Sequence, residues 1–192
     1  MRRPLLPAAH TRAMAELSGL MRQAGAPVAA EIKRLPEMVP LSSLPTAARG
    51  EITIGLRDDT LGVLTIPSDG TVAVTGPPGS GRTTALHSIA AGARAAYPGV
   101  KLVLLTPDRR SPLLGLPLWT RSSVGTEGAG ALADELTSTL ELPGAEPLVV
   151  VVEKLAEWSD SPSEYSSESL MKAVVRAGGL EIGRASCRER VS

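Results

Sequence analysis

The sequence predicts an α/β fold built around a parallel sheet. Apolar runs that are rich in Val, Ile and Leu alternate along the chain with stretches of helical periodicity. The expected strands lie at 71–75, 100–106 and 148–152, and the helices between them run from Thr83 to before Pro98 and from Gly128 to Leu140. The second and third strands are almost wholly apolar, as strands covered on both faces should be. This order predicts a doubly wound domain.

Composition limits the size of the domain and its partners. The 192 residues, 43% of them apolar, are enough for one globular domain. Lysine plus arginine and aspartate plus glutamate both total 20, so no net charge attracts nucleic acid or a membrane, and any DNA contact must be local. Aromatic residues make up only 2%, too few for the stacking platforms of single-strand binders.

Cysteine usage and hydropathy predict a cytosolic chain. Cys187 is the only cysteine, which excludes an internal disulfide, and the two histidines, His10 and His87, cannot complete a zinc site with it. No export signal is present, and the longest aliphatic run, 148–152, is far shorter than the ~20 residues of a membrane helix. A membrane anchor of the whole protein would lie outside this chain.

Proline and glycine residues divide the chain into segments. Helical spacing predicts an N-terminal helical segment at 1–34, broken at 25–27, whose excess of arginine and lysine indicates either a solvated helix face or a contact surface. Three prolines make 35–50 an extended connector. A β-hairpin opens the main domain at 51–180, and a final helix is expected near 170–175.

The last twelve residues differ in character. The segment 181–192 contains the only cysteine and several arginines and has no helical or strand periodicity. Its amino-acid sequence resembles translated cloning or adapter sequence. We therefore expect a non-native tail here, and leave it out of the functional argument.

A glycine-rich turn between the first expected strand and helix predicts a phosphate-binding loop. The expected nucleotide-binding residues are Gly76, Pro77, Pro78, Gly79, Ser80, Gly81, Arg82, Thr83 and Thr84. Glycines let the backbone curl so that several N–H groups converge on one anion, and the helix start adds its positive end. Thr83 lies where a hydroxyl normally binds Mg²⁺. The alternative is a glycine-rich turn that binds nothing.

Two positions depart from the usual pattern. Arg82 occupies the place of the lysine that normally reaches between the phosphates. The planar guanidinium keeps the positive charge of a lysine but has a different shape. We therefore expect nucleotide binding to survive better than catalysis, which needs exact placement of the charge. The strand 148–152 should be followed by two acids, one for Mg²⁺ and one for water activation, but only Glu153 is there, followed by Lys154. Glu153 is the candidate catalytic and metal-binding residue, or else an ordinary exposed acid.

Other polar residues carry weaker signals. Glu157 and Asp160, a turn away, are poor substitutes for the missing acid. His87 is expected to be a packing or surface residue. The segment Asp108-Arg109-Arg110 is either a solvated loop or a contact to nucleotide or a neighbouring subunit.

Three segments carry a resemblance to a known family. The run 34–37, the hairpin residues 54–59 and the loop 75–84 resemble FtsK/SpoIIIE-type ATPase domains over about residues 30–180. The sequence is most similar to the degenerate C-terminal domains of multi-domain actinobacterial members, including EccC-like ATPases of type VII secretion.

The resemblance implies a RecA-like P-loop NTPase fold, incomplete at the C-terminus, with strands missing on both sides of the phosphate-loop strand and unpaired edges as a result. It also implies ATP with Mg²⁺ as cofactors, other ATPase domains in a ring-like assembly as partners, and DNA or a secreted protein as the transported substrate. We expect hydrolysis to be impaired by the changes at Arg82 and Lys154. A non-catalytic regulatory domain is the alternative, and a small-molecule kinase, for which no lid or acceptor signature is seen, is a weaker one.

Overall fold

The structure is a computed structural model that describes residues 7–23, 34–159 and 161–186. The chain forms two units, Met1–Arg34 and Leu35–Ser192. The described part of the first unit is one helix, α1 (Pro7–Gln23), in agreement with the apolar spacing of the sequence. The predicted break at 25–27 lies outside the described residues, as do Arg2, Arg3 and Lys33 of the six basic residues expected in this unit.

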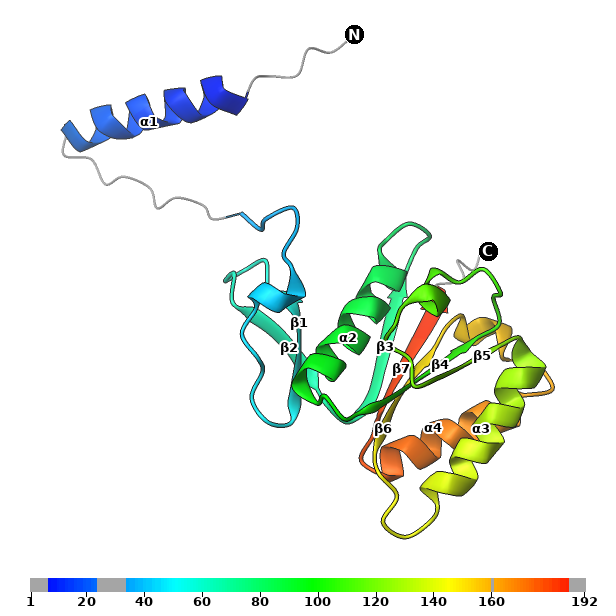
Figure 1. Cartoon of the computed structure of the whole chain (residues 1–192). Coiled ribbons are helices and arrows are strands. Elements are labelled where there is room, and N and C mark those ends of the chain that lie inside the picture. Colours follow the sequence, from blue (N-terminus) through cyan, green and yellow to red (C-terminus); the bar gives the residue numbers. More distant parts are fainter. Residues whose placement is uncertain (1–6, 24–33, 160, 187–192) are drawn as a thin grey trace. The chain divides into compact units, whose positions relative to one another are not determined.

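A five-stranded parallel sheet forms the centre of the second unit (Figure 1). All of its neighbouring strands pair in parallel. The strands follow one another across the sheet in the order β3 (Gly70–Gly76), β7 (Leu180–Ser186), β6 (Leu148–Val152), β4 (Lys101–Thr106) and β5 (Arg121–Val124). The predicted α/β fold with a parallel sheet is confirmed.

Helices cover both faces of this sheet (Figure 1). One face carries α2 (Arg82–Ala96), and the other carries α3 (Thr126–Leu140) and α4 (Glu164–Arg176). In β4, Leu102 and Leu104 pack on the α2 side while Val103 and Leu105 pack on the α3 and α4 side. Burial on both faces explains why the strand is apolar at successive positions rather than at alternate ones. Short 3₁₀ helices lie at Leu41–Ser43, Pro112–Gly115 and Leu155–Glu157.

The predicted hairpin is confirmed as an antiparallel pair that packs on α2. It consists of β1 (Glu51–Leu56) and β2 (Val63–Pro67). Ile52 is 1% exposed and belongs to the α2-side core. At Gly92 in α2 a Cβ atom would collide with the backbone carbonyl of Thr53. Glycine at this position therefore allows the strand to lie directly on the helix, which fixes the hairpin to the domain.

Two strands of the sheet were not predicted. β5 has the polar sequence Arg-Ser-Ser-Val and forms an edge of the sheet by pairing with β4. β7 falls mostly in the segment 181–192, where we expected no strand, but residues 180–186 pair with β3 on one side and with β6 on the other. Leu180 and Ile182 are fully buried in the α2-side core. The sheet thus continues to Ser186, beyond the predicted boundary at 180, whereas a non-native origin of 181–192 stays a prediction.

The strand that precedes the phosphate loop has one paired side. We expected unpaired edges on both sides of this strand, but β7 occupies one of them. Among the described residues, β3 pairs with no strand other than β7. Thr71, Ala73 and Thr75 alternate as exposed residues with the half-buried Val72 and Val74, so one face of β3 is open to solvent.

Candidate phosphate-binding site

The glycine-rich segment forms a tight connection from β3 to α2, as predicted. β3 ends at Gly76 and α2 begins at Arg82, so the turn occupies only the residues between them. Gly79 and Gly81 have φ angles of 79° and 81°, in the left-handed region that side chains disfavour. Gly76 has φ 156°, and a Cβ atom there would lie 2.6 Å from Ser80 Oγ. Backbone conformation therefore requires glycine at all three positions.

The loop presents its backbone to solvent at the start of a helix. Residues 77–81 are exposed, and Gly81 is the N-cap of α2. The first N–H groups of a helix have no acceptor within it and bear partial positive charge, which suits an anion. The side chains of Arg82 and Thr83 are half-buried and Thr84 is exposed. The expected strand-to-helix bend is thus present, while the roles of its side chains stay predictions.

Glu153 lies at the carboxyl end of β6 in a buried and rigid position. Its residue exposure is only 2%, so the alternative interpretation as an exposed acid at a strand end is wrong. The Glu153 N–H donates to the Leu105 carbonyl at 3.0 Å, and the Trp158 indole donates to the Glu153 carbonyl at 2.8 Å. These two bonds fix the backbone of the residue that the sequence analysis expected to be a catalytic or metal-binding acid.

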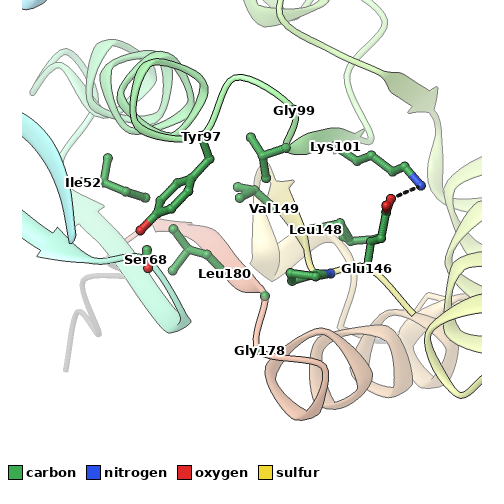
Figure 2. A pocket seen from close by; sticks show the side chains of 13 residues that line it. Ile52, Ser68, Tyr97, Gly99, Lys101, Glu146, Leu148, Val149, Gly178 and Leu180 are labelled. Carbon is green, nitrogen blue, oxygen red and sulfur yellow. Dashed lines mark ion pairs between the residues drawn. The ribbon is translucent and has the colours of Figure 1, made fainter. Parts of the chain in front are cut away.

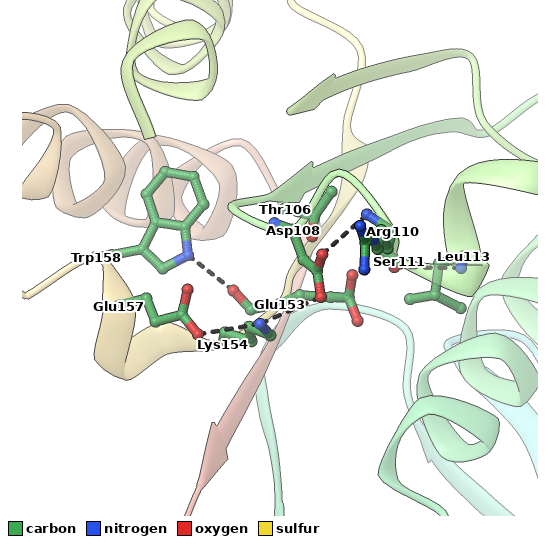
Figure 3. A network of polar contacts seen from close by, with 9 residues as sticks. All are labelled: Thr106, Asp108, Arg110, Ser111, Leu113, Glu153, Lys154, Glu157 and Trp158. Atoms are coloured by element: carbon green, nitrogen blue, oxygen red, sulfur yellow. Dashed lines mark hydrogen bonds and ion pairs between the residues drawn. The ribbon is translucent and has the colours of Figure 1, made fainter. Parts of the chain in front are cut away.

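Lys154, the next residue, is bound between two carboxylates (Figure 3). Its Nζ lies 3.1 Å from Glu157 Oε1 and 3.3 Å from Asp108 Oδ2. Hydrogen bonding to Glu157 and then to Asp108 raises the pKa of the Lys154 ammonium. Its backbone is in the left-handed region, with φ 53° and ψ 52°, which is uncommon for a residue with a side chain. The sequence did not predict this three-residue cluster.

Asp108 contributes to the cluster from the loop after β4 (Figure 3). The Arg110 N–H donates to Asp108 Oδ1 at 2.9 Å, and this bond, followed by the one from Lys154, lowers the pKa of the Asp108 carboxyl. Arg109 and Arg110 are exposed, as expected of a solvated charged loop. His87 is also exposed, so of the two roles expected for it, packing or surface, it is a surface residue. Asp160 lies outside the described residues.

Known proteins resemble this chain in structure. No protein-family model and no curated protein sequence matches it. Among solved structures, the cytoplasmic domain of the Thermomonospora curvata type VII secretion ATPase EccC superposes with a TM-score of 0.63 at 22% identity, over 84% of this chain and 22% of that one. EssC (ATPases 2 and 3) from Geobacillus thermodenitrificans superposes with a TM-score of 0.55 at 19% sequence identity, over 91% of this chain and 36% of that one. The conjugation coupling protein TcpA of pCW3, in its monomer form with ATPγS, superposes with a TM-score of 0.54 at 15% sequence identity, over 73% of this chain and 49% of that one.

The chain has the fold of these ATPases. The resemblance to FtsK/SpoIIIE-type ATPase domains that the sequence indicated is thereby confirmed at the level of the fold, a RecA-like P-loop fold. The chain spans less than half the length of each of the three solved structures.

The ATPase fold places the predicted site residues at one edge of the sheet. Because the strands are parallel, the loop after β3 and residues 153–154 after β6 both lie at the carboxyl ends of strands, with β7 between them. Over the part of the chain that the structure describes, no group of three or more His, Cys, Asp or Glu side chains is arranged to hold a metal. Thr83 and Glu153, the residues expected to bind Mg²⁺, both follow strands that end at this edge.

The opposite edge of the ATPase fold contains a cavity of about 360 Å³ (Figure 2). It lies where β4, β6 and β7 begin, and its lining is mainly apolar, with Leu148, Val149 and Leu180 among the side chains. Tyr97 and the Lys101–Glu146 ion pair, at 2.9 Å, supply polar groups. Nothing in the sequence pattern pointed to this cavity, because its lining comes from separate elements that only the fold brings together.

None of the helices in 7–23, 34–159 and 161–186 combines the length and apolar character needed to cross a bilayer.

Proposed function

We propose that this domain binds ATP together with Mg²⁺ at the loop 76–84. The observation that carries the proposal is the turn from β3 to α2, in which three glycines adopt conformations that only glycine tolerates well. A turn of this kind directs backbone N–H groups at a polyphosphate, which a generic strand-to-helix turn has no need to do. The presence of ATPγS in the TcpA structure, which shares the fold, supports a nucleotide as the ligand.

Side chains of the loop would complete the site. Arg82 would neutralise the phosphates through charge-assisted hydrogen bonds, and the Thr83 hydroxyl would bind Mg²⁺. Glu153, buried at the end of β6, would face the metal through its carboxylate or a bound water. Mg²⁺ supplies neutralisation of the phosphate charge when it is bound.

We propose further that hydrolysis is impaired. A general base must accept a proton from the attacking water, and a protonated lysine has no lone pair with which to do so. Lys154 stands directly after Glu153, and its pKa is raised rather than lowered by its carboxylate neighbours. The same observation favours the second candidate function, a non-catalytic regulatory domain that retains nucleotide.

Binding is tested by substitution in the loop. Arg82→Ala and Thr83→Ala should each weaken the affinity for Mg²⁺–ATP, the arginine change by about 10- to 100-fold, because a charged hydrogen-bond donor to phosphate is lost. Isothermal titration calorimetry measures this loss. The exposed Arg49→Ala provides a charge-matched control that should bind as the wild type does. Unchanged affinity in both loop variants would overturn the proposal.

Steady-state phosphate release separates the two candidate functions. A rate that Glu153→Gln abolishes would show an active ATPase and contradict impaired hydrolysis. Nucleotide binding without turnover, unaffected by Glu153→Gln, would support the regulatory domain. In either case Glu153→Gln removes one carboxylate charge while keeping the volume of the side chain.

We propose a protein-secretion ATPase as the whole protein, with a DNA translocase as the alternative. Two of the solved structures of this fold are described as EccC, a type VII secretion ATPase, and as EccC in complex with a signal sequence peptide. The neutral net charge gives no general attraction to DNA. Other ATPase domains in a ring-like assembly are the proposed partners. DNA binding that falls steeply with salt concentration would favour the translocase instead.

A further inference from the structure

We propose that Lys154 binds the terminal phosphate of ATP and so makes the site select ATP over ADP, with Asp108 and Glu157 holding the ammonium when that phosphate is absent. This inference rests on the proposed function, because it assigns a specificity residue to the same site. Lys154, which stands where a second acid was expected after Glu153, thereby gains a role that the proposed function does not give it.

Strand order brings Lys154 within reach of the phosphates. β6 is two positions from β3 in the sheet, which is about 10 Å at the usual spacing of strands. In the structure the Lys154 ammonium lies on the β4 side of β6, beside Asp108. A lysine side chain reaches about 6 Å from its Cα, so the ammonium would have to leave Asp108 and turn toward the loop to meet a triphosphate whose terminal phosphate points toward β6. On this proposal the turned ammonium would contact the terminal phosphate of ATP, a group that ADP lacks.

The backbone around Lys154 is fixed on both sides. The bonds from Glu153 N–H to Leu105 and from the Trp158 indole to Glu153 hold the residue before it. On the other side, the Glu157 N–H donates to the Lys154 carbonyl at 2.7 Å. A left-handed conformation persists in a residue with a side chain when its surroundings enforce it. The side chain thus starts from a defined point at the edge of the sheet.

The two carboxylates of the cluster hold the ammonium loosely enough to release it. The Lys154 side chain is 33% exposed, and those of Asp108 and Glu157 are 37% and 52% exposed. Solvent screens ion pairs at such exposure, so each contributes little by itself. A phosphate group carries more charge and several acceptor oxygens, and so competes well with them. Asp108 keeps its bond from the Arg110 N–H when the ammonium leaves.

The experiment measures affinity for two nucleotides with the full chain. Calorimetric titration with Mg²⁺–ATPγS and Mg²⁺–ADP gives a ratio of dissociation constants that does not depend on turnover. In the wild type we expect ATPγS to bind about tenfold more tightly than ADP, and in Lys154→Met the two to bind about equally, with affinity for ADP retained. Lys154→Gly, which relieves the left-handed backbone, should behave in the same way. Lys172→Met, which also removes a lysine paired with a carboxylate, should keep the wild-type ratio.

A third variant tests the holding role of the carboxylates. Glu157→Gln leaves the ammonium with one carboxylate partner, so the preference for ATPγS should increase about two- to threefold. The inference is overturned if the ratio in both Lys154 variants equals that of the wild type, or if their affinity for ADP falls as much as that for ATPγS. If the wild type binds neither nucleotide, the proposed function fails and the inference fails with it. Binding of both nucleotides with an unchanged ratio removes only the inference.

Discussion

The phosphate loop and the end of β6 lie at the same edge of the sheet, yet they relate differently to the expected pattern. In the loop, one side chain departs from the pattern, at Arg82, but the three glycine conformations are kept. At the end of β6, Glu153 is kept and backbone-fixed, but Lys154 occupies the place of a second acid. Recognition of phosphate by backbone N–H groups depends little on side-chain identity, whereas proton transfer depends on it entirely. Binding and hydrolysis can therefore be lost separately.

Gly76→Val is the strongest way to break the comparison. The new Cβ would lie 2.6 Å from Ser80 Oγ, and the φ angle of 156° is strained for a branched side chain. We expect the loop to change shape and the affinity for Mg²⁺–ATP to fall by about 100-fold or more, since several N–H groups lose their common target. Nucleotide titration and circular dichroism measure binding and folding together.

The matched change at β6 is Glu153→Gln, which should retain binding to within about tenfold because it removes only one of the proposed ligands of Mg²⁺. If both variants lost affinity equally, the division between a backbone site and a side-chain site would have to be given up.

A change in β7, the strand between the two regions, should have a smaller effect. Glu181 is 3% exposed, and burial raises the pKa of its carboxyl, while a hydrogen bond with Thr71 opposes this shift. Since the raised value belongs to the folded state, the ionised carboxylate destabilises the fold, and the free energy of unfolding falls as pH rises above the ordinary glutamate pKa. Glu181→Gln should thus stabilise the chain by about 1 kcal/mol at pH 7.

Chemical denaturation at several pH values tests this linkage. The gain from Glu181→Gln should vanish below about pH 4, where the carboxyl is protonated in both states. Glu168→Gln on α4, at an exposed position, is the control and should leave stability nearly unchanged. A destabilised Glu181→Gln variant at neutral pH would mean that the hydrogen bond with Thr71 outweighs the cost of burying the Glu181 carboxylate.

The smallest expected effect concerns the opposite edge. The Gly50 N–H donates to Tyr97 Oη at 3.0 Å beside the cavity, and because this bond is exposed Tyr97→Phe should cost only about 0.5 kcal/mol of stability. Affinity for nucleotide should stay within about twofold of the wild type, because the change lies at the amino ends of the strands. Thermal melting and nucleotide titration give the two quantities. A large loss of affinity in a folded variant would show that the two edges are coupled.

The parts of the fold that the sequence predicts are those with local signals. β4 and β6 are apolar at successive positions, and α2 and α3 have regular apolar stripes, so each can be recognised without its neighbours. β5 has no such pattern and exists because β4 offers it backbone partners. In β7 a buried glutamate, Glu181, lies between Leu180 and Ile182, and glycines adjoin both apolar residues, so no strand pattern is visible. This segment forms a strand because β3 and β6 pair with it on either side.

The same distinction applies to the site. The glycines of the loop are predictable because each meets a conformational demand of its own residue. The contact of Lys154 with Asp108 joins the ends of two strands that are distant in the sequence, and only the order of the sheet brings them together. The hydrogen bond of Trp158 to Glu153 depends on a short 3₁₀ turn at 155–157 that carries no apolar periodicity.

The indole of Trp158 gives this edge of the molecule its own optical signal. The chain has two tryptophans, and Trp158 is 2% exposed and bonded to the carbonyl that precedes Lys154. Its emission is therefore sensitive to small rearrangements at the end of β6. With Trp119→Phe, the remaining fluorescence would come from this position alone, and mixing with nucleotide would follow the motion of the strand end in real time.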